Sequence, residues 1–232
     1  MNKLKQNIIF LVSALFYISF LNGQTYTFTN AGATGREGPT QAQVDANYSG
    51  TSLEGAVTIN TQGIQEWLVP ISGIYKIEAL GAQGGAGTDG ANNLPGLGAK
   101  MSGLFDLSYN NCIKIIVGQE GLASAGGGGG GGSFAWIDGS SMPLIVSGGG
   151  GGTGDQGQGG IGAANGKDGV VDINGTNSRE NHGIGGVEGH FGSPGTGSSM
   201  AGGGGAGWLS HNADSSISGI SPLNGGQGGH LG

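Results

Sequence analysis

SAGGGGGGGSFAWIDGSSMPLIVSGGGGG, residues 124 to 152, places a run of seven glycines and a run of five around a segment rich in aromatic and branched residues. Glycine-rich stretches are usually flexible linkers between domains. The intervening SFAWIDGSSMPLIVS (133–147) is too short to be a domain, and it needs strand partners across the gaps. Since long structureless loops are improbable inside a compact domain, we expect the glycine runs to be ordered.

Glycine is unevenly distributed along the chain of 232 residues. The first 80 residues hold 8 of the 57 glycines, and the other 49 lie from Gly81 onward. Charged residues make up only 10% of the chain, which argues against the highly charged kind of disorder. We expect one glycine-rich domain over 24–232, with mainly sandwich strands in 24–120 and glycine-rich helices with interspersed strands in 121–232.

A run of glycines can be ordered as a left-handed helix of the polyproline II type, here polyglycine II. Such helices have three residues per turn, and seven residues at about 3.1 Å each extend about 22 Å, comparable to a strand. Ordering costs roughly 1–2 kcal/mol per residue, so several helices must bond to one another. No strict Gly-X-Y period is present, which excludes collagen. In such a bundle a branched side chain at Gly129 is expected to have no space.

Eight short segments have the apolar pattern of β-strands and are bounded by turn residues. They are TYTFT (25–29), GAVTI (55–59), IQEWLV (64–69), IYKIEAL (74–80), KMSGLFDL (100–107), CIKIIV (112–117), SFAWI (133–137) and PLIVS (143–147). Helical periodicity is nearly absent, and only QAQVDANY (41–48) favours a turn or two of helix. The pattern predicts an all-β fold, an antiparallel β-sandwich.

The sandwich core is predicted to bury alternate members of Trp67, Val69, Ile74, Tyr75, Ile77, Ile113, Ile115 and Val117. The residues predicted to hold the structure together are Trp67 and Ile115 in this core and, in the glycine runs, Gly126, Gly127, Gly128, Gly129, Gly130, Gly131, Gly132, Gly148, Gly149, Gly150, Gly151 and Gly152.

Residues 1–23 have the pattern of a secretory signal peptide, with two early lysines before an apolar run from Ile8 to Leu21. A membrane anchor is the alternative, but a span needs about 20 apolar residues. Cleavage near Gly23 leaves a mature chain with a net charge of -9, and this acidity argues against a nucleic-acid partner. No second apolar stretch of spanning length follows, so we expect a secreted or cell-surface chain.

The sequence contains partial matches to catalytic and binding motifs, but each lacks a neighbouring feature that the motif requires. We therefore expect no catalytic, cofactor or metal site. GAGTDG (85–90) follows a strand but is not followed by a helix, as a dinucleotide site requires. The segment around Lys167 departs from a phosphate loop in glycine spacing and in Asp168. The single calcium-type repeat at 84–91 has no second copy, and the four histidines are scattered. Cys112 alternates with apolar residues, which indicates strand packing.

Four stretches resemble the glycine-rich extracellular region of the family of anaplastic lymphoma kinase and leukocyte tyrosine kinase. They are NAGATGREGPTQAQVDANY (30–48), GIQEWLVPISGIYKIEALGAQGG (63–85), KMSGLFDLSYNNCIKIIVGQEG (100–121) and the glycine block that opens at Gly126. The resemblance runs in order from about Tyr26 to Gly152. It implies a tumour-necrosis-factor-like β-sandwich with an inserted bundle of polyglycine II helices.

The chain also departs from that family. The animal members carry a cysteine just after the TQAQ stretch, where this chain has Val44, and Cys112 has no partner for an internal disulfide. No kinase motif is present, so the kinase domain of the family is absent from this sequence. The signal peptide, the lack of a second cysteine and the start rich in Asn, Lys and Ile suggest a bacterial secreted relative.

Three functions remain open from the sequence. The first is a non-enzymatic extracellular recognition module that displays sandwich loops to a protein or glycan. The second is a structural adhesin or matrix component whose glycine helices are the functional material, with ice binding as a variant. The third is the amino-terminal part of a longer receptor.

Overall fold

The computed structural model describes residues 23–88, 93–123, 127–154, 165–172, 174–177, 185–190, 192, 207–210 and 219–227. The predicted signal peptide, apart from its last residue, and Gly126 lie outside the described residues. The elements are α2 (Gln41–Tyr48), β1 (Val57–Thr61), β2 (Ile64–Leu68), β3 (Gly73–Leu80), β4 (Lys100–Leu107), β5 (Cys112–Ile116), β6 (Ser133–Ile137), β7 (Ile145–Ser147) and the 3-10 turn η2 (Pro222–Asn224).

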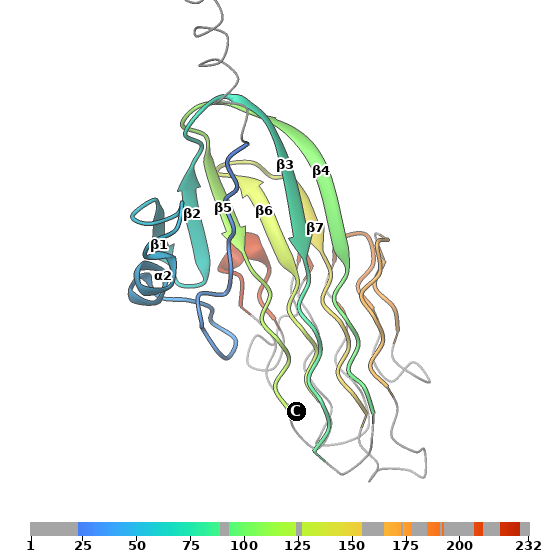
Figure 1. The fold of residues 1–232 in the computed structure, drawn as a ribbon. Helices are drawn as coiled ribbons and strands as arrows, with labels where there is room; N and C mark the ends of the chain where they lie inside the picture. The colour runs from blue at the N-terminus through green and yellow to red at the C-terminus, as the bar shows by residue number, and fades with distance from the viewer. Residues whose placement is uncertain are drawn as a thin grey trace, which may run out of the picture.

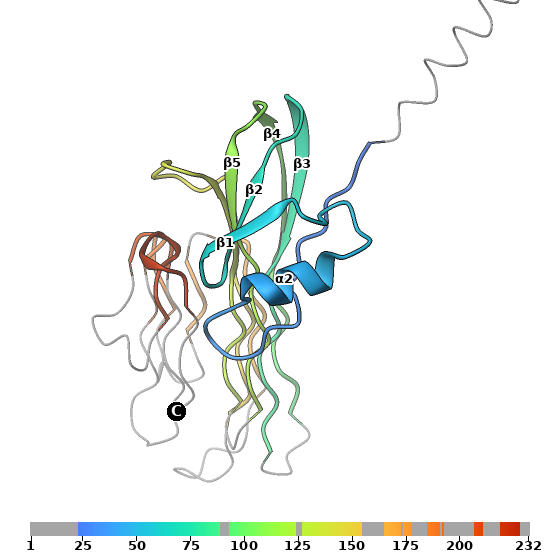
Figure 2. The same ribbon diagram turned by 90° about the vertical axis from the view of Figure 1, so that its left-hand side faces the viewer.

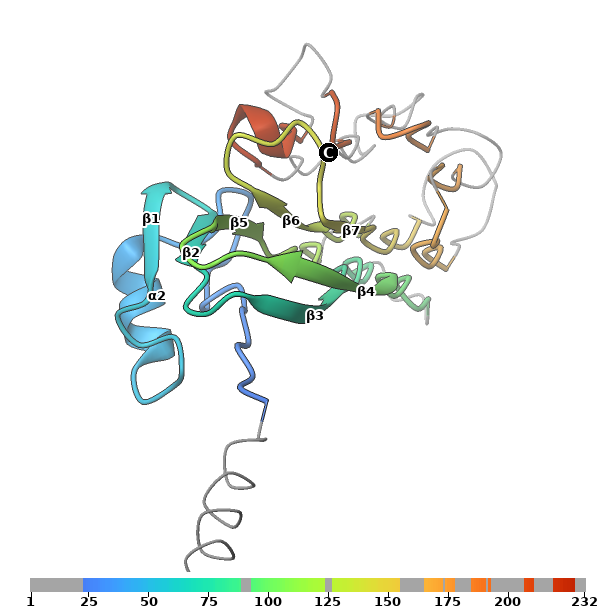
Figure 3. The same ribbon diagram turned by 90° about the horizontal axis from the view of Figure 1, so that it is seen from above.

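The seven strands form two antiparallel sheets (Figure 1). The larger sheet has the order β1-β2-β5-β6-β7, and the smaller sheet consists of β3 and β4. Seen from above, β3 and β4 form a layer beside β5, β6 and β7, lower in the picture (Figure 3). The predicted all-β class is therefore confirmed, with α2 as a single short α-helix among the described residues.

One apolar core fills the space between the two sheets. In the larger sheet Trp67 pairs with Ile113 and both are buried, while Ile115 is half-buried and packs against the same core. Tyr75 contributes its ring from the smaller sheet, 6.1 Å from the ring of Trp67. Ile74 is one of the predicted apolar set, but it is 67% exposed because it lies on the outer face of β3.

The predicted strand TYTFT (25–29) is not part of either sheet, so this prediction was wrong. The segment is extended, but its hydrogen bonds go to side chains instead of a neighbouring strand: Thr29 N donates to the Tyr48 hydroxyl, and the Gln65 amide donates to Thr29 O. Its aromatic rings still join the core, because Tyr26 lies 4.7 Å from the Trp67 ring. The alternation of apolar residues in 25–29 therefore indicated correctly which side chains are buried, but it did not indicate that the backbone pairs with a strand.

Residues 41–48 form the helix α2, as the sequence favoured. Thr40 and Gln43 make a capping box at its start, which satisfies two backbone donors at the helix end. Gln41 then reaches the outer edge of β1, where its amide accepts from Ile59 N at 2.7 Å and donates to Val57 O at 3.0 Å. Figure 2 shows α2 beside β1. The side chain of Gln41 thus occupies the place of a further strand at this edge.

Two glycines with positive φ bring the loop before α2 against the hairpin between β1 and β2. A Cβ on Gly38 would lie 2.5 Å from Gly63 Cα, and a Cβ on Gly63 would lie 2.4 Å from Glu37 O. Gly63 N also donates to Pro39 O at 3.0 Å. Only glycine allows both this φ and this approach, which accounts for Gly38, the second glycine of the GREGPT stretch.

The glycine-rich segments are direct continuations of the strands. In Figure 1 they leave the lower end of both sheets and run side by side away from the core. Segments 81–88, 117–123 and 148–154 follow β3, β5 and β7, and segments 93–99 and 127–132 lead into β4 and β6. We call these five segments, together with 165–170, the glycine bundle.

Candidate functional site

The backbone hydrogen bonds of the glycine bundle repeat every three residues. Gly81 N donates to Ala99 O at 2.9 Å, and Gly84 N donates to Gly96 O at 3.0 Å. Both donors and both acceptors are three residues apart, so one side of each segment faces the other. A strand would present every second residue to a neighbour, whereas a helix with three residues per turn presents every third.

The next residues of the same segment bond to a different neighbour with the same spacing. Ala82 N donates to Gly131 O at 2.9 Å, and Gly85 N donates to Gly128 O at 2.7 Å. One segment therefore bonds to partners on several sides, which the two edges of a β-strand do not allow. Segment 81–88 is bonded in this way to 93–99, 117–123, 127–132 and 148–154.

Segment 148–154 bonds to four neighbours in the same manner, among them 93–99, whose Gly96 N donates to Gly151 O at 2.8 Å. Gly150 N donates to Ala82 O at 2.8 Å, while Gly150 O accepts from Gly130 N at 2.8 Å. Gly151 N donates to Lys167 O at 2.7 Å. The predicted residues Gly130, Gly131, Gly150 and Gly151 are thus brought together in one hydrogen-bonded network.

Several glycines of the bundle leave no room for a side chain. A Cβ on Gly130 would lie 2.3 Å from Ala82 O, and a Cβ on Gly149 would lie 2.0 Å from Gly130 O. Gly129 differs, because the nearest atom to its Cβ would be Gly150 O at 3.9 Å and the residue is exposed. The expectation that a side chain has no space at Gly129 was therefore wrong. Gly129 faces solvent whereas Gly130 faces another backbone, so only some glycines of a run are required.

Some side chains of the bundle project into solvent, and two others accept hydrogen bonds from backbone N–H groups of segment 93–99. Leu94 and Leu97 are 69% and 59% exposed and are three residues apart. Their N–H groups donate to the Asn165 and Asp168 side chains at 3.0 and 2.7 Å. Asn165 and Asp168 are again three residues apart, so their carbonyl and carboxylate oxygens match the repeat of the segment that they bind.

Two buried serines stand where the strands end and the glycine bundle begins. The Ser133 hydroxyl donates to Leu80 O at 2.6 Å and accepts from Gly118 N at 2.9 Å. Ser147, which is fully buried, donates to Ala99 O at 2.5 Å and accepts from Gly81 N at 3.0 Å. Each serine joins the two sheets at this end. Neither serine was predicted from the sequence, although a serine directly beside each glycine run was a visible signal.

The outer face of the larger sheet carries a charged cluster. Lys114 Nζ lies 2.8 Å from Asp138 Oδ1 and 3.6 Å from Glu66 Oε1. The hydrogen bond between Lys114 and Asp138 is the main cause of a raised pKa for Lys114 and a lowered pKa for Asp138, so both stay charged. Burial, followed by the nearby Glu66 and Asp138, raises the pKa of the Cys112 thiol, which keeps it protonated and unreactive.

A cleft of about 410 Å³ opens beside this cluster, between the sheet, the loop after β6 and η2. It is lined by Thr61, Ile64, Lys114, Trp136, Asp138, Gly139, Ser140, Ser141, Pro222, Leu223 and Gly225. Figure 2 shows η2, in red, on the side of the larger sheet away from β3. The cleft therefore combines an ion pair and hydroxyl groups with an apolar floor.

Trp208 fixes the C-terminal part of the chain against this face. Its ring lies 5.5 Å from the ring of Trp136 and 6.3 Å from that of Phe134. Its indole N–H donates to Ser141 O at 3.0 Å. Trp208 is thus attached to the sheet by aromatic packing and to the β6–β7 loop by a hydrogen bond.

The described residues contain no group of three or more histidine, cysteine, aspartate or glutamate side chains that could hold a metal ion. Within that part of the chain, no helix is long and apolar enough to cross a membrane.

Taken together, the fold and the bundle define an all-β protein in which hydrogen-bonded glycine segments extend the strands. Among curated proteins, the leukocyte tyrosine kinase receptor of Mus musculus is 41% identical over 101 residues. The match covers 41% of this chain, and the chain spans only 11% of the receptor's length. No family model matches the chain. The similarity to a receptor tyrosine kinase is therefore partial.

Proposed function

We propose that this chain is a non-enzymatic extracellular recognition module that binds another extracellular protein. The observation that carries the proposal is the continuity between strands and glycine bundle, together with the partial similarity to a receptor. A module that recognises a partner needs surfaces held in fixed positions. The bundle supplies this by linking five strand ends to one another through backbone hydrogen bonds.

The segments of the bundle are, in this proposal, polyglycine II helices, and the two sheets form a tumour-necrosis-factor-like sandwich. The three-residue spacing of the bonds from Gly81 and Gly84 supports the helical assignment. Amides bonded in this way should resist hydrogen exchange, whereas a flexible linker would exchange at the rate of an unfolded chain. Fast exchange throughout 127–132 would contradict the assignment.

We place the binding surface at the cleft around Lys114 and Asp138. Its walls come from the sheet, the β6–β7 loop and η2, so the surface exists only when the whole domain is folded. Its ion pair and hydroxyl groups offer donors and acceptors beside exposed Leu223, a combination that suits a polar peptide surface.

The test is binding by the purified, labelled chain to an array of secreted and cell-surface proteins, with a glycan array in parallel. We expect saturable binding to a protein that is weakened at least tenfold by Asp138→Lys, which reverses the charge beside Lys114. Lys76→Glu on the outer face of the smaller sheet is the control and should leave binding unchanged. Binding to glycans alone, or equal binding by both variants, would contradict the proposal.

A structural role is the second candidate, and the outward leucines of the bundle favour it. Leu94 and Leu97 are exposed and three residues apart, so the same pair of leucines on a second bundle can pack against them. In that case the chain should assemble into fibres or sheets in which the bundles lie side by side, visible by electron microscopy. Leu94→Ser with Leu97→Ser should abolish such assembly without affecting binding at the cleft.

We also propose that the chain has no kinase or nucleotide-binding activity, since its match to the receptor lies outside the kinase domain. Lys167, the lysine of the rejected phosphate-loop motif, lies in segment 165–170, where its carbonyl accepts a hydrogen bond from Gly151 N. A ligand at 100 times its dissociation constant adds roughly 2.7 kcal/mol to the unfolding free energy. ATP with magnesium should therefore leave the melting temperature unchanged; an increase abolished by Lys167→Ala would reverse this proposal.

A further inference from the structure

The edges of the two sheets are protected to different degrees. An edge strand exposes unpaired N–H and C=O groups, and proteins usually cover or shorten such edges. Gln41 occupies the edge of β1, and β7 at the other edge of that sheet has only three residues. β4 has eight residues and pairs only with β3 among the described strands. Figure 1 shows β4 at the right-hand border of its sheet.

β4 lacks most of the features that usually prevent pairing at an edge, because its charged residues lie only near its two ends. It has no proline, no bulge interrupts its register from Lys100 to Leu107, and its inward side chains carry no charge. Gly103 lies near its middle, and the Phe105 ring covers it on the inner face, 2.8 Å from the position of a Cβ. A glycine within a strand often marks a place where another backbone approaches closely.

The outer face of β4 is apolar in the middle and charged at the ends. Leu104 is 72% exposed, between Lys100 near one end and Asp106 near the other. Asp106 makes no ion pair with any described residue, and Lys100 lies 3.4 Å from Glu78 with most of its side chain exposed. These two opposite charges are arranged symmetrically about Gly103.

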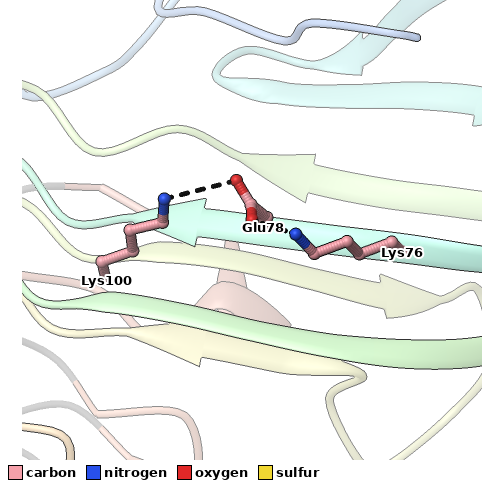
Figure 4. A network of polar contacts seen from close by, with 3 residues as sticks. All are labelled: Lys76, Glu78 and Lys100. Carbon is pink, nitrogen blue, oxygen red and sulfur yellow. Dashed lines mark hydrogen bonds and ion pairs between the residues drawn. The ribbon is translucent and has the colours of Figure 1, made fainter.

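β3 has the same length, but its charges are already paired. Glu78 lies between Lys76, at 2.5 Å, and Lys100 (Figure 4). The hydrogen bond from Lys76, helped by Lys100, lowers the pKa of Glu78. On the inner side of β3, the rings of Tyr26 and Tyr75 pack on Trp67. Of the two edges of the small sheet, that of β4 has the unpaired charge.

We propose that the free edge of β4 pairs with β4 of a second copy of the chain, antiparallel and across a two-fold axis at Gly103. In this register Lys100 lies opposite Asp106 of the second copy, and the reverse pair forms at the other end. Residues that pair share a face of the sheet, so all four charges lie on the outer face. The two small sheets then become one sheet of four strands.

The same register brings the exposed leucines together. Leu104 lies opposite Ser102 of the second copy, and its diagonal neighbour is Leu104 of that copy, about 7–8 Å away and within reach of a long side chain. Because the strands are antiparallel, the two glycine bundles extend in opposite directions. Segment 165–170 bonds to both 93–99 and 148–154.

The association state of the purified chain tests this proposal, measured by sedimentation over about 5 to 500 µM. We expect a concentration-dependent dimer. Lys100→Glu or Asp106→Lys alone should weaken it about tenfold or more, because each converts two cross-strand attractions to repulsions. A mixture of the two single variants should restore a heterodimer, since each like-charged pair then becomes an opposite pair. The melting temperature of each variant verifies that it is folded.

Lys76→Glu is the matched control, because it makes the same change of charge on the same face but on β3. It should leave the dimer intact. A chain that stays monomeric over the whole range would overturn the proposal, as would a dimer that Lys76→Glu weakens as much as Lys100→Glu does. Failure of the mixed variants to associate would also overturn the register at Gly103.

Discussion

Two alanine substitutions at neighbouring glycines, Gly129 and Gly130, distinguish a packed bundle from a flexible linker. In Gly130→Ala the new Cβ would lie 2.3 Å from Ala82 O and 2.5 Å from Gln83 O, so the segments must separate by more than half an ångström. Overpacking of this kind costs about 1–3 kcal/mol. The separation also lengthens bonds such as Gly130 N to Gly150 O, each worth about 0.5–1.5 kcal/mol.

We expect Gly130→Ala to lower the free energy of unfolding by about 3 kcal/mol, or the melting temperature by roughly 6–12 °C for a domain of this size. Gly129→Ala is the control. Its Cβ has no atom closer than 3.9 Å and its φ lies outside the left-handed region. Replacing such a glycine restricts the unfolded chain and should raise stability by about 0.4–1 kcal/mol.

Thermal unfolding followed by circular dichroism compares the two variants directly, and hydrogen exchange locates the change. The loss of protection in Gly130→Ala should be concentrated in 81–88, 127–132 and 148–154. Equal melting temperatures for the two variants would refute the packing argument, because a linker does not distinguish one glycine of a run from the next.

Three further changes test other parts of the molecule. Ile115→Ala removes a half-buried side chain from the core and should cost about 2 kcal/mol by denaturant unfolding; an unchanged midpoint would contradict its inward position. Ser147→Ala removes one of the two donors to Ala99 O, which keeps its hydrogen bond from Gly81 N, and should cost about 0.5–1.5 kcal/mol, with the larger loss of exchange protection where β4 begins and β7 ends. The pKa of Asp138 is lowered in the folded state by Lys114, so its stabilising contribution is present above the unfolded pKa and is lost as pH falls below about 4. Asp138→Asn should therefore reduce the loss of stability on acidification, and identical acid titrations of the two proteins would contradict this.

The strands could be predicted because their apolar residues alternate with the period of a sheet that has one buried face. The prediction succeeded for β2 and β5, where Trp67 and Ile113 face the core. It failed for TYTFT (25–29), since burial of Tyr26 and Phe28 gives the same alternation without a partner strand. Alternation reports which side chains are inside, and hydrogen bonding depends on the neighbours that the fold supplies.

The glycine runs were predicted as ordered segments, but the sequence did not reveal which glycines are essential. Gly129 and Gly130 are both flanked by glycines in the sequence, yet only Gly130 lies close to the backbone of another segment. The positions of the neighbouring segments decide this, and those follow from the order of the strands. Likewise, the cleft around Lys114 combines β5 with η2, more than 100 residues later, and no local pattern indicated it.

The three-residue repeat also limits how the length of this protein can vary. Two bonded segments stay in register only if both change by the same multiple of three, which moves the tip by about 9 Å per turn. The strands are unaffected, because Ser133 and Ser147 fix their ends. Insertions of three residues in every segment would therefore lengthen the glycine bundle in discrete steps. An insertion of one or two residues would instead have to form a loop outside the hydrogen-bonded network.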